Sequence, residues 1–332
     1  MMKAVEVLGT KANPEVTLNP AVPKPSPKNG EILIKVHAAG LTGDEITWWE
    51  LWEHPIRIPG HDISGEVAEL GPNYKGDLKV GDEVYSMIHG WRGLGQAEYA
   101  IVESDEVARK PKSLSHAQAS ALPIPLLTAW ESIFERANLQ KGQKVLVTGA
   151  SGAVGVIVVQ MASRLAGAEV VALSSAQHHD SLRALGASQL VDYNTPNWED
   201  TITDVDVVID TVGNPVLAKT WKTVKSHGHI ITVGQPPAAW EYGKGRPEEL
   251  DDFPNVKWLF FVVTPKSETL DKVARLIDEG TIKPIAIEVF SLDKVIQAHK
   301  HASIRNRKGK VVIEFVPEKL KTGFGQNGII WK

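Results

Sequence analysis

Cysteine is missing from this sequence. None of the 332 residues is a cysteine, so disulfide bonds, thiolate nucleophiles and cysteine-ligated zinc are all excluded. Any catalytic, binding or structural role must therefore be carried by other side chains.

An excess of charge of one sign is missing as well. The chain has 36 Lys and Arg against 40 Asp and Glu, which gives a formal net charge of −4 at pH 7. Because nucleic-acid binding relies on basic surfaces that neutralise phosphates, we expect no nucleic-acid partner. The densest basic group is typical of a solvated surface and contains Arg305, Arg307, Lys308 and Lys310.

Long hydrophobic runs are the third absence. No apolar run reaches the length of a membrane span, so we expect no membrane partner. Strand-like alternation begins at Lys3, without the basic and apolar regions of a secretory signal. The sequence therefore predicts a soluble, cytoplasmic protein.

The most informative feature present is a glycine-rich turn at residues 145–155. Val145 to Val147 are typical of a buried strand, and apolar residues then repeat at helical spacing. Gly152 would let the backbone approach phosphates, and Gly155 would let helix and strand pack closely. The pattern predicts a dinucleotide-binding turn, although an isolated match also fits an ordinary strand-helix turn. The expected cofactor contacts here are Ala150, Ser151, Gly152, Ala153 and Val154.

Further apolar runs follow at the spacing of a doubly wound sheet. They cover residues 169–173, 189–192, 206–210, 229–233 and 258–263, with helical crossovers expected at 180–185 and 215–224. Together with the first run they make six parallel strands. In open α/β sheets ligands lie beyond the carboxyl ends of strands, where we expect further cofactor contacts. These are Val212, Gly213, Val233, Gly234, Phe261 and Val262.

The remaining segments predict a second, β-rich domain, in line with a length that favours two domains. Short strands are expected at residues 31–36, 62–69, 83–87, 98–102, 286–290 and 309–315, with helices at 267–278 and 292–299. We expect residues 1–122 and 264–316 to form this domain and residues 123–263 the nucleotide-binding domain. A cleft between them would bring substrate and cofactor together. The tail, residues 317–332, has no expected role.

An ordered series of motifs gives residues 2–316 a family resemblance. The motifs are VHAAGL from Val36, PGHDISGEV from Pro59, VGDEVY from Val80, GQAEY from Gly95, LP at Leu122, LTAW from Leu127, LGA from Leu185 and KGKVVI from Lys308. In these the chain resembles the medium-chain dehydrogenase/reductase superfamily, in its zinc-free quinone oxidoreductase-like and enoyl reductase branch. The resemblance implies an α/β protein with a GroES-like, β-rich catalytic domain and a Rossmann domain with a doubly wound, parallel six-stranded sheet.

The resemblance also indicates whether the chain can bind a catalytic zinc ion. Zinc alcohol dehydrogenases of this superfamily carry a cysteine, a histidine and a cysteine at the positions of Thr42, His61 and Ile124. Since only the histidine is present, a tetrahedral site with three protein ligands cannot be built, and we expect no zinc. His61 is then expected to be a packed or hydrogen-bonded histidine, and Asp62 to orient backbone or cofactor groups.

Without a Lewis acid, hydride delivery is easier to an acceptor that is already activated. The resemblance therefore implies NADPH-dependent reduction of a small, apolar quinone or of the activated C=C bond of an α,β-unsaturated carbonyl. Thr128 matches the threonine that lies against the nicotinamide in relatives, and a helix N-cap is the alternative for it. Thr42 and Tyr85 are candidates to donate hydrogen bonds to the developing oxyanion. A proton taken from solvent would serve equally well.

The choice of cofactor is indicated at the end of the second Rossmann strand. Ser174 stands near the place where a carboxylate would hold the ribose hydroxyls of NAD, which favours NADP(H) over NAD(H). Relatives that prefer NADP carry a lysine and a tyrosine where this chain has His178 and Tyr193. The alternative for His178 is plain helix surface.

Three tryptophans, Trp48, Trp49 and Trp52, fall in the segment that borders the cleft in relatives. Large apolar faces suit a flat substrate, although core packing explains them equally well. The resemblance is also consistent with a homodimer that extends the sheet beyond its sixth strand. Two other functions stay open: a biosynthetic enoyl reductase for a polyketide-like intermediate, and a non-catalytic NADPH-binding structural or regulatory protein.

Overall fold

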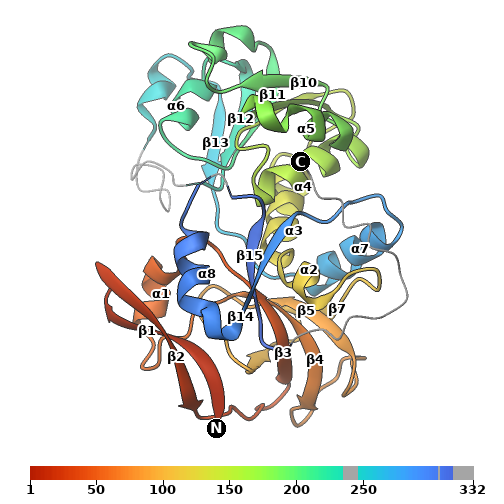
Figure 1. Ribbon diagram of the computed structural model, residues 1–332. Helices are drawn as coiled ribbons and strands as arrows, with labels where there is room; N and C mark the ends of the chain where they lie inside the picture. The colour runs from red at the N-terminus through yellow and green to blue at the C-terminus, as the bar shows by residue number, and fades with distance from the viewer. Residues whose placement is uncertain (235–245, 306, 317–332) are drawn as a thin grey trace.

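Two large sheets organise the protein, and they lie at opposite ends of the molecule in Figure 1. The structure is a computed structural model that describes residues 1–234, 246–305 and 307–316. One sheet has six strands and the other has seven on its main path. A separate two-stranded sheet is formed by β1 (Met2–Thr10) and β2 (Asn13–Val22). Trp240 and the tail 317–332 lie outside the described residues.

The six-stranded sheet has the order β10-β9-β8-β11-β12-β13, and all its neighbours are parallel. Its strands are β8 (Lys144–Val147), β9 (Glu169–Ser174), β10 (Gln189–Asp192), β11 (Val205–Asp210), β12 (Val224–Thr232) and β13 (Lys257–Phe260). The predicted parallel six-stranded sheet is thus confirmed. β12 begins earlier than expected because Val224 already pairs with Val205, ahead of an irregularity in the register. β13 ends at Phe260, so Phe261 and Val262 lie beyond it.

Helices supply the crossovers that parallel strands require. They are α4 (Ala153–Arg164), α5 (His179–Leu185) and α6 (Val216–Thr220), with short 3-10 helices at Ala176–His178 and Trp198–Thr201. A further 3-10 helix, Glu248–Asp251, precedes β13. Among the described residues, no helix is both long enough and apolar enough to cross a membrane.

The seven-stranded sheet has the order β14-β15-β3-β4-β5-β7, with β6 also paired to β3. Its strands are β3 (Ile32–Gly40), β4 (Asp62–Leu70), β5 (Glu83–Met87), β6 (Tyr99–Val102), β7 (Val107–Arg109), β14 (Ile287–Ser291) and β15 (Lys310–Glu314). The β-rich half predicted from the short apolar runs is therefore confirmed. β15 runs antiparallel to β3, so strands from both ends of the chain share this sheet. The domain bounds given above stay a prediction.

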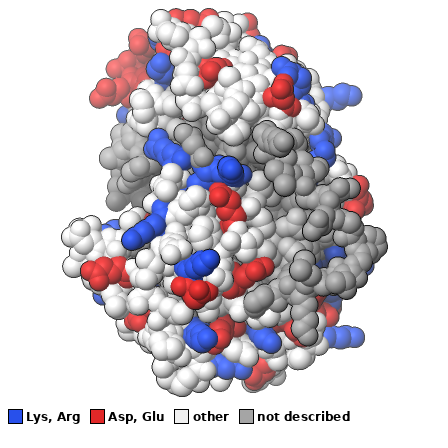
Figure 2. Space-filling model, in the orientation of Figure 1, with Lys and Arg blue, Asp and Glu red and all other residues white. Residues whose placement is uncertain are grey.

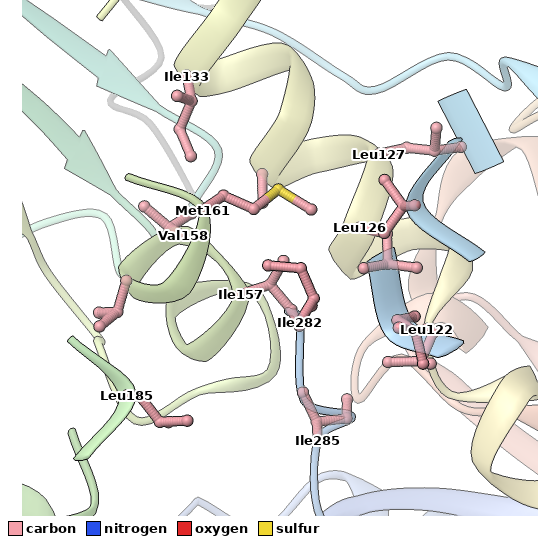
Figure 3. Packing of buried hydrophobic residues seen from close by; sticks show 14 of the residues in the cluster. Leu122, Leu126, Leu127, Ile133, Ile157, Val158, Met161, Leu185, Ile282 and Ile285 are labelled. Carbon is pink, nitrogen blue, oxygen red and sulfur yellow. The ribbon is translucent and has the colours of Figure 1, made fainter. Parts of the chain in front are cut away.

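Helices between the sheets form the largest apolar core (Figures 1 and 3). α3 (Pro123–Trp130) continues as a π-helix, Glu131–Arg136, and packs on α4. Leu126 of α3 and Ile157 of α4 are fully buried there, and burial of each such side chain stabilises the fold by about 1.5–3 kcal/mol. The other helices are α1 (Trp49–Trp52), α2 (His116–Ser120), α7 (Ser267–Asp278) and α8 (Val295–Ala302).

Charged side chains of both signs lie interspersed on the face seen in Figure 2. One charged pair is buried instead. Asp62, at the start of β4, accepts a short hydrogen bond from the Lys310 ammonium of β15, and both residues are buried. The other carboxylate oxygen accepts the backbone N–H of Ile124, in the first turn of α3, at 2.8 Å. Asp62 therefore ties together two distant strands and a helix.

Breaking this pair should be costly. In Lys310→Met a side chain of similar length leaves the Asp62 carboxylate buried without a cation, so we expect the free energy of unfolding to fall by about 3–5 kcal/mol. Urea unfolding followed by circular dichroism measures the change. Lys225→Met is the matched control, because Lys225 pairs with Asp206 at 2.7 Å on the surface and should cost about 0–1 kcal/mol. Equal losses in the two variants would contradict this role.

Candidate active site

The glycine turn joins β8 to α4 at the carboxyl edge of the six-stranded sheet. Gly149 has φ +57°, a conformation that favours glycine. A Cβ on Gly155 would lie 2.3 Å from the carbonyl oxygen of Gly149, so helix and strand approach too closely for any side chain. Within the described chain no side chain caps α4 at Gly152. Its first N–H groups are therefore available to an anion.

The predicted contacts of the turn do not all face outward. Ser151 and Gly152 are exposed, and Ala153 and Val154 are half-buried. Ala150 is completely buried, and its N–H donates to the carbonyl oxygen of Leu173 at 3.1 Å. Of the predicted contacts of the turn, Ala150 is the one that packing against Gly155 takes inside the protein.

A buried carboxylate that the sequence analysis missed organises the neighbouring strand ends. Asp210, the last residue of β11, accepts hydrogen bonds from Thr148 Oγ1 at 2.5 Å and Thr232 Oγ1 at 2.7 Å. It also accepts the backbone N–H groups of Val212 at 3.3 Å and Gly213 at 2.9 Å. Asp210 thus fixes the ends of β8, β11 and β12. The sequence did contain a signal for this network, because each of three apolar runs ends in a polar residue: Thr148, Asp210 and Thr232.

This arrangement brings two predicted cofactor loops together. A Cβ on Gly234 would lie 2.6 Å from the backbone nitrogen of Gly213, so the loops after β11 and β12 touch. Val212 and Val233 are half-buried beside these glycines. β11 lies next to β8 in the sheet, and β12 lies next to β11. Both loops therefore lie on the edge of the sheet where the glycine turn lies.

The three residues predicted to select the cofactor lie near one another. The backbone N–H of Tyr193 donates to the Ser174 carbonyl oxygen at 3.2 Å, and that of His178 donates to Ser175 at 3.0 Å. Ser174 is buried, whereas Tyr193 is exposed and His178 half-buried. Burial, and then the neighbouring His179, lower the pKa of His178. A neutral imidazole would therefore meet a ligand here.

Phe261 and Val262 differ in what they can contact. Phe261 is buried, with the Arg136 guanidinium 5.2 Å from its ring centre. Val262 is 61% exposed. Of the two, Val262 is the accessible one.

Thr42 and Thr128 come from elements that meet at Asp62. The register pairs Asp62 with Gly40 at the end of β3, two residues before Thr42, and Asp62 also holds the N–H of Ile124 in α3. Thr128 lies one turn further along α3 and is buried. It sits in the helix interior, so the N-cap interpretation is wrong. The π-helix that begins at Glu131 is a feature found frequently at functional sites.

Tyr85 is not available for substrate. Its side chain is completely buried, and its hydroxyl donates to the backbone carbonyl oxygen of Leu270 in α7 at 2.7 Å. Burial raises the pKa of Tyr85 well above its ordinary value. The predicted oxyanion role of Tyr85 is therefore wrong, because α7 covers β5 at this point.

The three tryptophans do not share one environment. Trp48 lies 5.2 Å from the ring of His61, and Trp49 is 45% exposed and meets Trp91 edge-on at 5.2 Å. Trp52 donates its indole N–H to the Ile46 carbonyl oxygen at 3.1 Å, beneath the guanidinium of Arg57. Trp52 is half-buried and has packing partners of its own, and its assignment to the substrate pocket stays a prediction.

A tetrahedral zinc does not fit the residues present. Two of the three ligand positions hold Thr42 and Ile124, and the chain has no cysteine to replace them. His61 is buried, its Nε2 is 3.3 Å from the Gly90 carbonyl oxygen, and burial lowers its pKa to about 4. Across residues 1–234, 246–305 and 307–316, no three His, Asp or Glu side chains form a group that could hold a metal ion.

Beside His61 lies a second buried network that the sequence analysis missed. Glu45 Oε1 accepts a hydrogen bond from Gln96 Nε2 at 2.5 Å, and Gln96 Oε1 accepts one from His299 Nε2 at 2.8 Å. All three side chains are buried. Burial raises the pKa of Glu45 to about 8 and lowers that of His299 to about 4. The partners are far apart in the chain, so no local pattern could reveal them.

Comparison with known proteins gives consistent matches along the chain. A family model described as "Alcohol dehydrogenase GroES-like domain" matches residues 28–112, and one described as "Zinc-binding dehydrogenase" matches residues 185–313. A 2-methylene-furan-3-one reductase of Solanum lycopersicum is 35% identical over 328 residues, covering 95% of this chain and 77% of that protein.

Two further relatives extend this picture. A chloroplastic NADPH-dependent alkenal/one oxidoreductase of Arabidopsis thaliana is 32% identical, and the match covers 88% of this chain and 74% of that protein. Among solved structures, the quinone oxidoreductase from Coxiella burnetii superposes with a TM-score of 0.82 at 27% identity, covering 94% of this chain and 99% of that one.

The two glycines at the start of α4 should respond differently to alanine. Gly155→Ala places a methyl group against backbone atoms of residues 149 and 150, so we expect a clear loss of thermal stability. Gly152→Ala meets only the Gly149 oxygen, at 3.2 Å, and should fold normally. Thermal unfolding by circular dichroism compares them. A Gly155→Ala protein as stable as Gly152→Ala would disprove the close contact.

Proposed function

The chain belongs to the medium-chain dehydrogenase/reductase superfamily, in its quinone oxidoreductase-like branch, and on this premise we propose that it passes hydride from NADPH to a quinone or an enone. The observation that carries the proposal is the glycine turn between β8 and α4, which presents uncapped N–H groups at the carboxyl edge of the sheet. The similarity to an NADPH-dependent alkenal/one oxidoreductase supports it.

The residues present fit a dinucleotide. Ser151, Gly152, Ala153 and Val154 would hold the pyrophosphate with the N-terminus of α4. The loops at Val212, Gly213, Val233 and Gly234, with Val262, would line the remainder of the cofactor. When bound, NADPH supplies the hydride.

NADP(H) rather than NAD(H) is the preferred cofactor in this proposal. No carboxylate follows β9, where one would repel a 2′-phosphate. Ser174, His178 and Tyr193 surround that position instead, and neutral His178 can donate a single hydrogen bond there.

Thr128 and Thr42 carry the positioning roles. Thr128 would lie against the nicotinamide, and Thr42, half-buried beyond β3, would donate a hydrogen bond to the substrate oxygen as it gains negative charge. An activated C=C bond or a quinone needs only this assistance, so the proposed reaction uses no zinc. Trp48 and Trp49 would provide apolar faces for a flat substrate.

Two expectations from the sequence stay predictions. Among the described strands, β13 lies at one edge of the six-stranded sheet, which suits the sheet extension expected in a homodimer. The cytoplasmic location likewise rests on the sequence alone.

The reaction is tested by mixing the protein with NADPH and either a benzoquinone or a small enone. We expect loss of NADPH absorbance and formation of the hydroquinone or the saturated carbonyl compound. Calorimetry measures NADPH binding separately. Absence of both binding and oxidation would refute the proposal, and binding without oxidation would favour the non-catalytic alternative.

Removing the imidazole at residue 178 should weaken NADPH binding selectively. We expect His178→Ala to lose about 1 kcal/mol toward NADPH, roughly fivefold in Kd, because one hydrogen bond to the 2′-phosphate is lost. NADH binding should not change. Calorimetry with both nucleotides checks this, with His227→Ala as control because that exposed histidine lies near the amino edge of the sheet. An equal effect on both nucleotides would remove His178 from the site.

A further inference from the structure

A small cavity lined by Glu45, Trp48 and His61 is surrounded by buried polar atoms that lack partners among the described residues. Among the described residues that line it, Glu45 Oε2, Glu50 Oε2, His61 Nδ1 and Arg92 Nε have no hydrogen-bond partner. The cavity measures about 10 Å³, near the lower limit for one water molecule. Since buried polar atoms are nearly always satisfied, this cluster points to a bound water.

The hydrogen bonds around Glu45 determine which oxygen carries a proton. Gln96 donates its amide N–H to Oε1 and accepts the His299 N–H with its own oxygen. Oε1 is thus an acceptor, and a proton on the carboxyl group must reside on Oε2. Oε2 is the atom without a partner in the described part of the chain. A water in the cavity would accept that proton's hydrogen bond.

Burial raises the pKa of Glu45 and outweighs the groups that lower it. Lys310 of β15 lowers this pKa, but the ammonium already holds the Asp62 carboxylate, and Asp62 itself raises it. Hydrogen bonds from the Thr42 backbone and the Gln96 side chain also lower it. The other titratable or charged groups nearby are His54, His61, Glu50 of α1, Arg92 of the loop after β5, and His299 of α8. Burial is the largest influence and puts the pKa at about 8, so the acid form predominates at pH 7.

We propose that Glu45 is the proton donor of the reduction and acts through the water in this cavity on the substrate oxygen held by Thr42. This inference rests on the proposed function. Glu45 follows that threonine by three residues, and its backbone N–H donates to the Thr42 carbonyl oxygen at 3.3 Å. Trp48, which we assign to the substrate, lines the same cavity as Glu45.

The step balances without any further reactant. The O–H bond at Oε2 breaks and a new O–H bond forms on the enolate or hydroquinone anion, while the water passes the proton between them. The hydride and this proton together complete the two-electron reduction. The product is the hydroquinone, or an enol that becomes the saturated carbonyl compound by tautomerisation. Glu45 is left as a carboxylate and regains its proton from solvent.

The pH dependence gives the first test. The acid form is required, so wild-type kcat with the enone should be constant at neutral pH and fall as the pH rises through about 8, the pKa of Glu45. Glu45→Gln keeps the hydrogen bond with Gln96 but has no proton to give. We expect kcat to fall by about 10²- to 10⁴-fold, with no inflection near that pH. Glu45→Asp should restore part of the rate together with an inflection.

Infrared spectroscopy without nucleotide gives an independent test. The difference spectrum of wild type minus Glu45→Gln should contain the carbonyl stretch of a protonated carboxyl group at pH 7, and the band should disappear as the pH rises through about 8. Glu199→Gln is the matched control, since Glu199 is a buried carboxylate that pairs with Lys219 at 3.2 Å, in the other half of the molecule. Its kcat profile should match wild type.

Each outcome decides the inference. A Glu45→Gln protein that turns over at the wild-type rate with the same inflection would overturn it. If that variant does not fold, Glu45→Asp replaces it in the test. A Glu45→Asp protein that lacks the carbonyl band at every pH and keeps the wild-type kcat profile would also overturn the inference. Failure of wild type itself to bind or oxidise NADPH would instead count against the proposed function.

Discussion

The architecture depends on one carboxylate that is held away from water. Asp62 accepts hydrogen bonds from Lys310 of β15 and from Ile124 in the first turn of α3. Lys310 is 248 residues from Asp62 in the chain, and Ile124 is 62 residues from it. A buried charge is tolerated only where it is compensated. The geometry at Asp62 is therefore fixed more narrowly than apolar packing alone would fix it. The two threonines of the proposed site belong to segments that meet there.

Two buried acids within the same region have different partners. Burial raises the pKa of Asp62, but its partners, the Lys310 ammonium and the Ile124 backbone N–H, both favour the charged form. Glu45 accepts a hydrogen bond from the Gln96 amide, and the nearby cation already belongs to Asp62. Both side chains are buried, so the two acids differ in their partners and not in their burial.

The sequence predicted the parts of this protein whose determinants are local. Six apolar runs, three of them followed closely by a glycine, specify the parallel sheet, because burial on both faces and tight turns are recorded in the local sequence. Tyr85 was misassigned because its partner, Leu270, lies 185 residues away in the chain and is brought to it only by the packing of α7. The networks around Asp210 and Glu45 likewise join residues that only the fold brings together.

The pairing of β15 with β3 has a consequence for synthesis on the ribosome. The six-stranded sheet is built from one continuous stretch of chain and can assemble as soon as that stretch emerges. The other sheet must wait for its last strand, and until then Asp62 has no ammonium to meet. Nascent chains should accordingly expose one unfinished edge for most of translation, an interval in which a chaperone would find its binding surface.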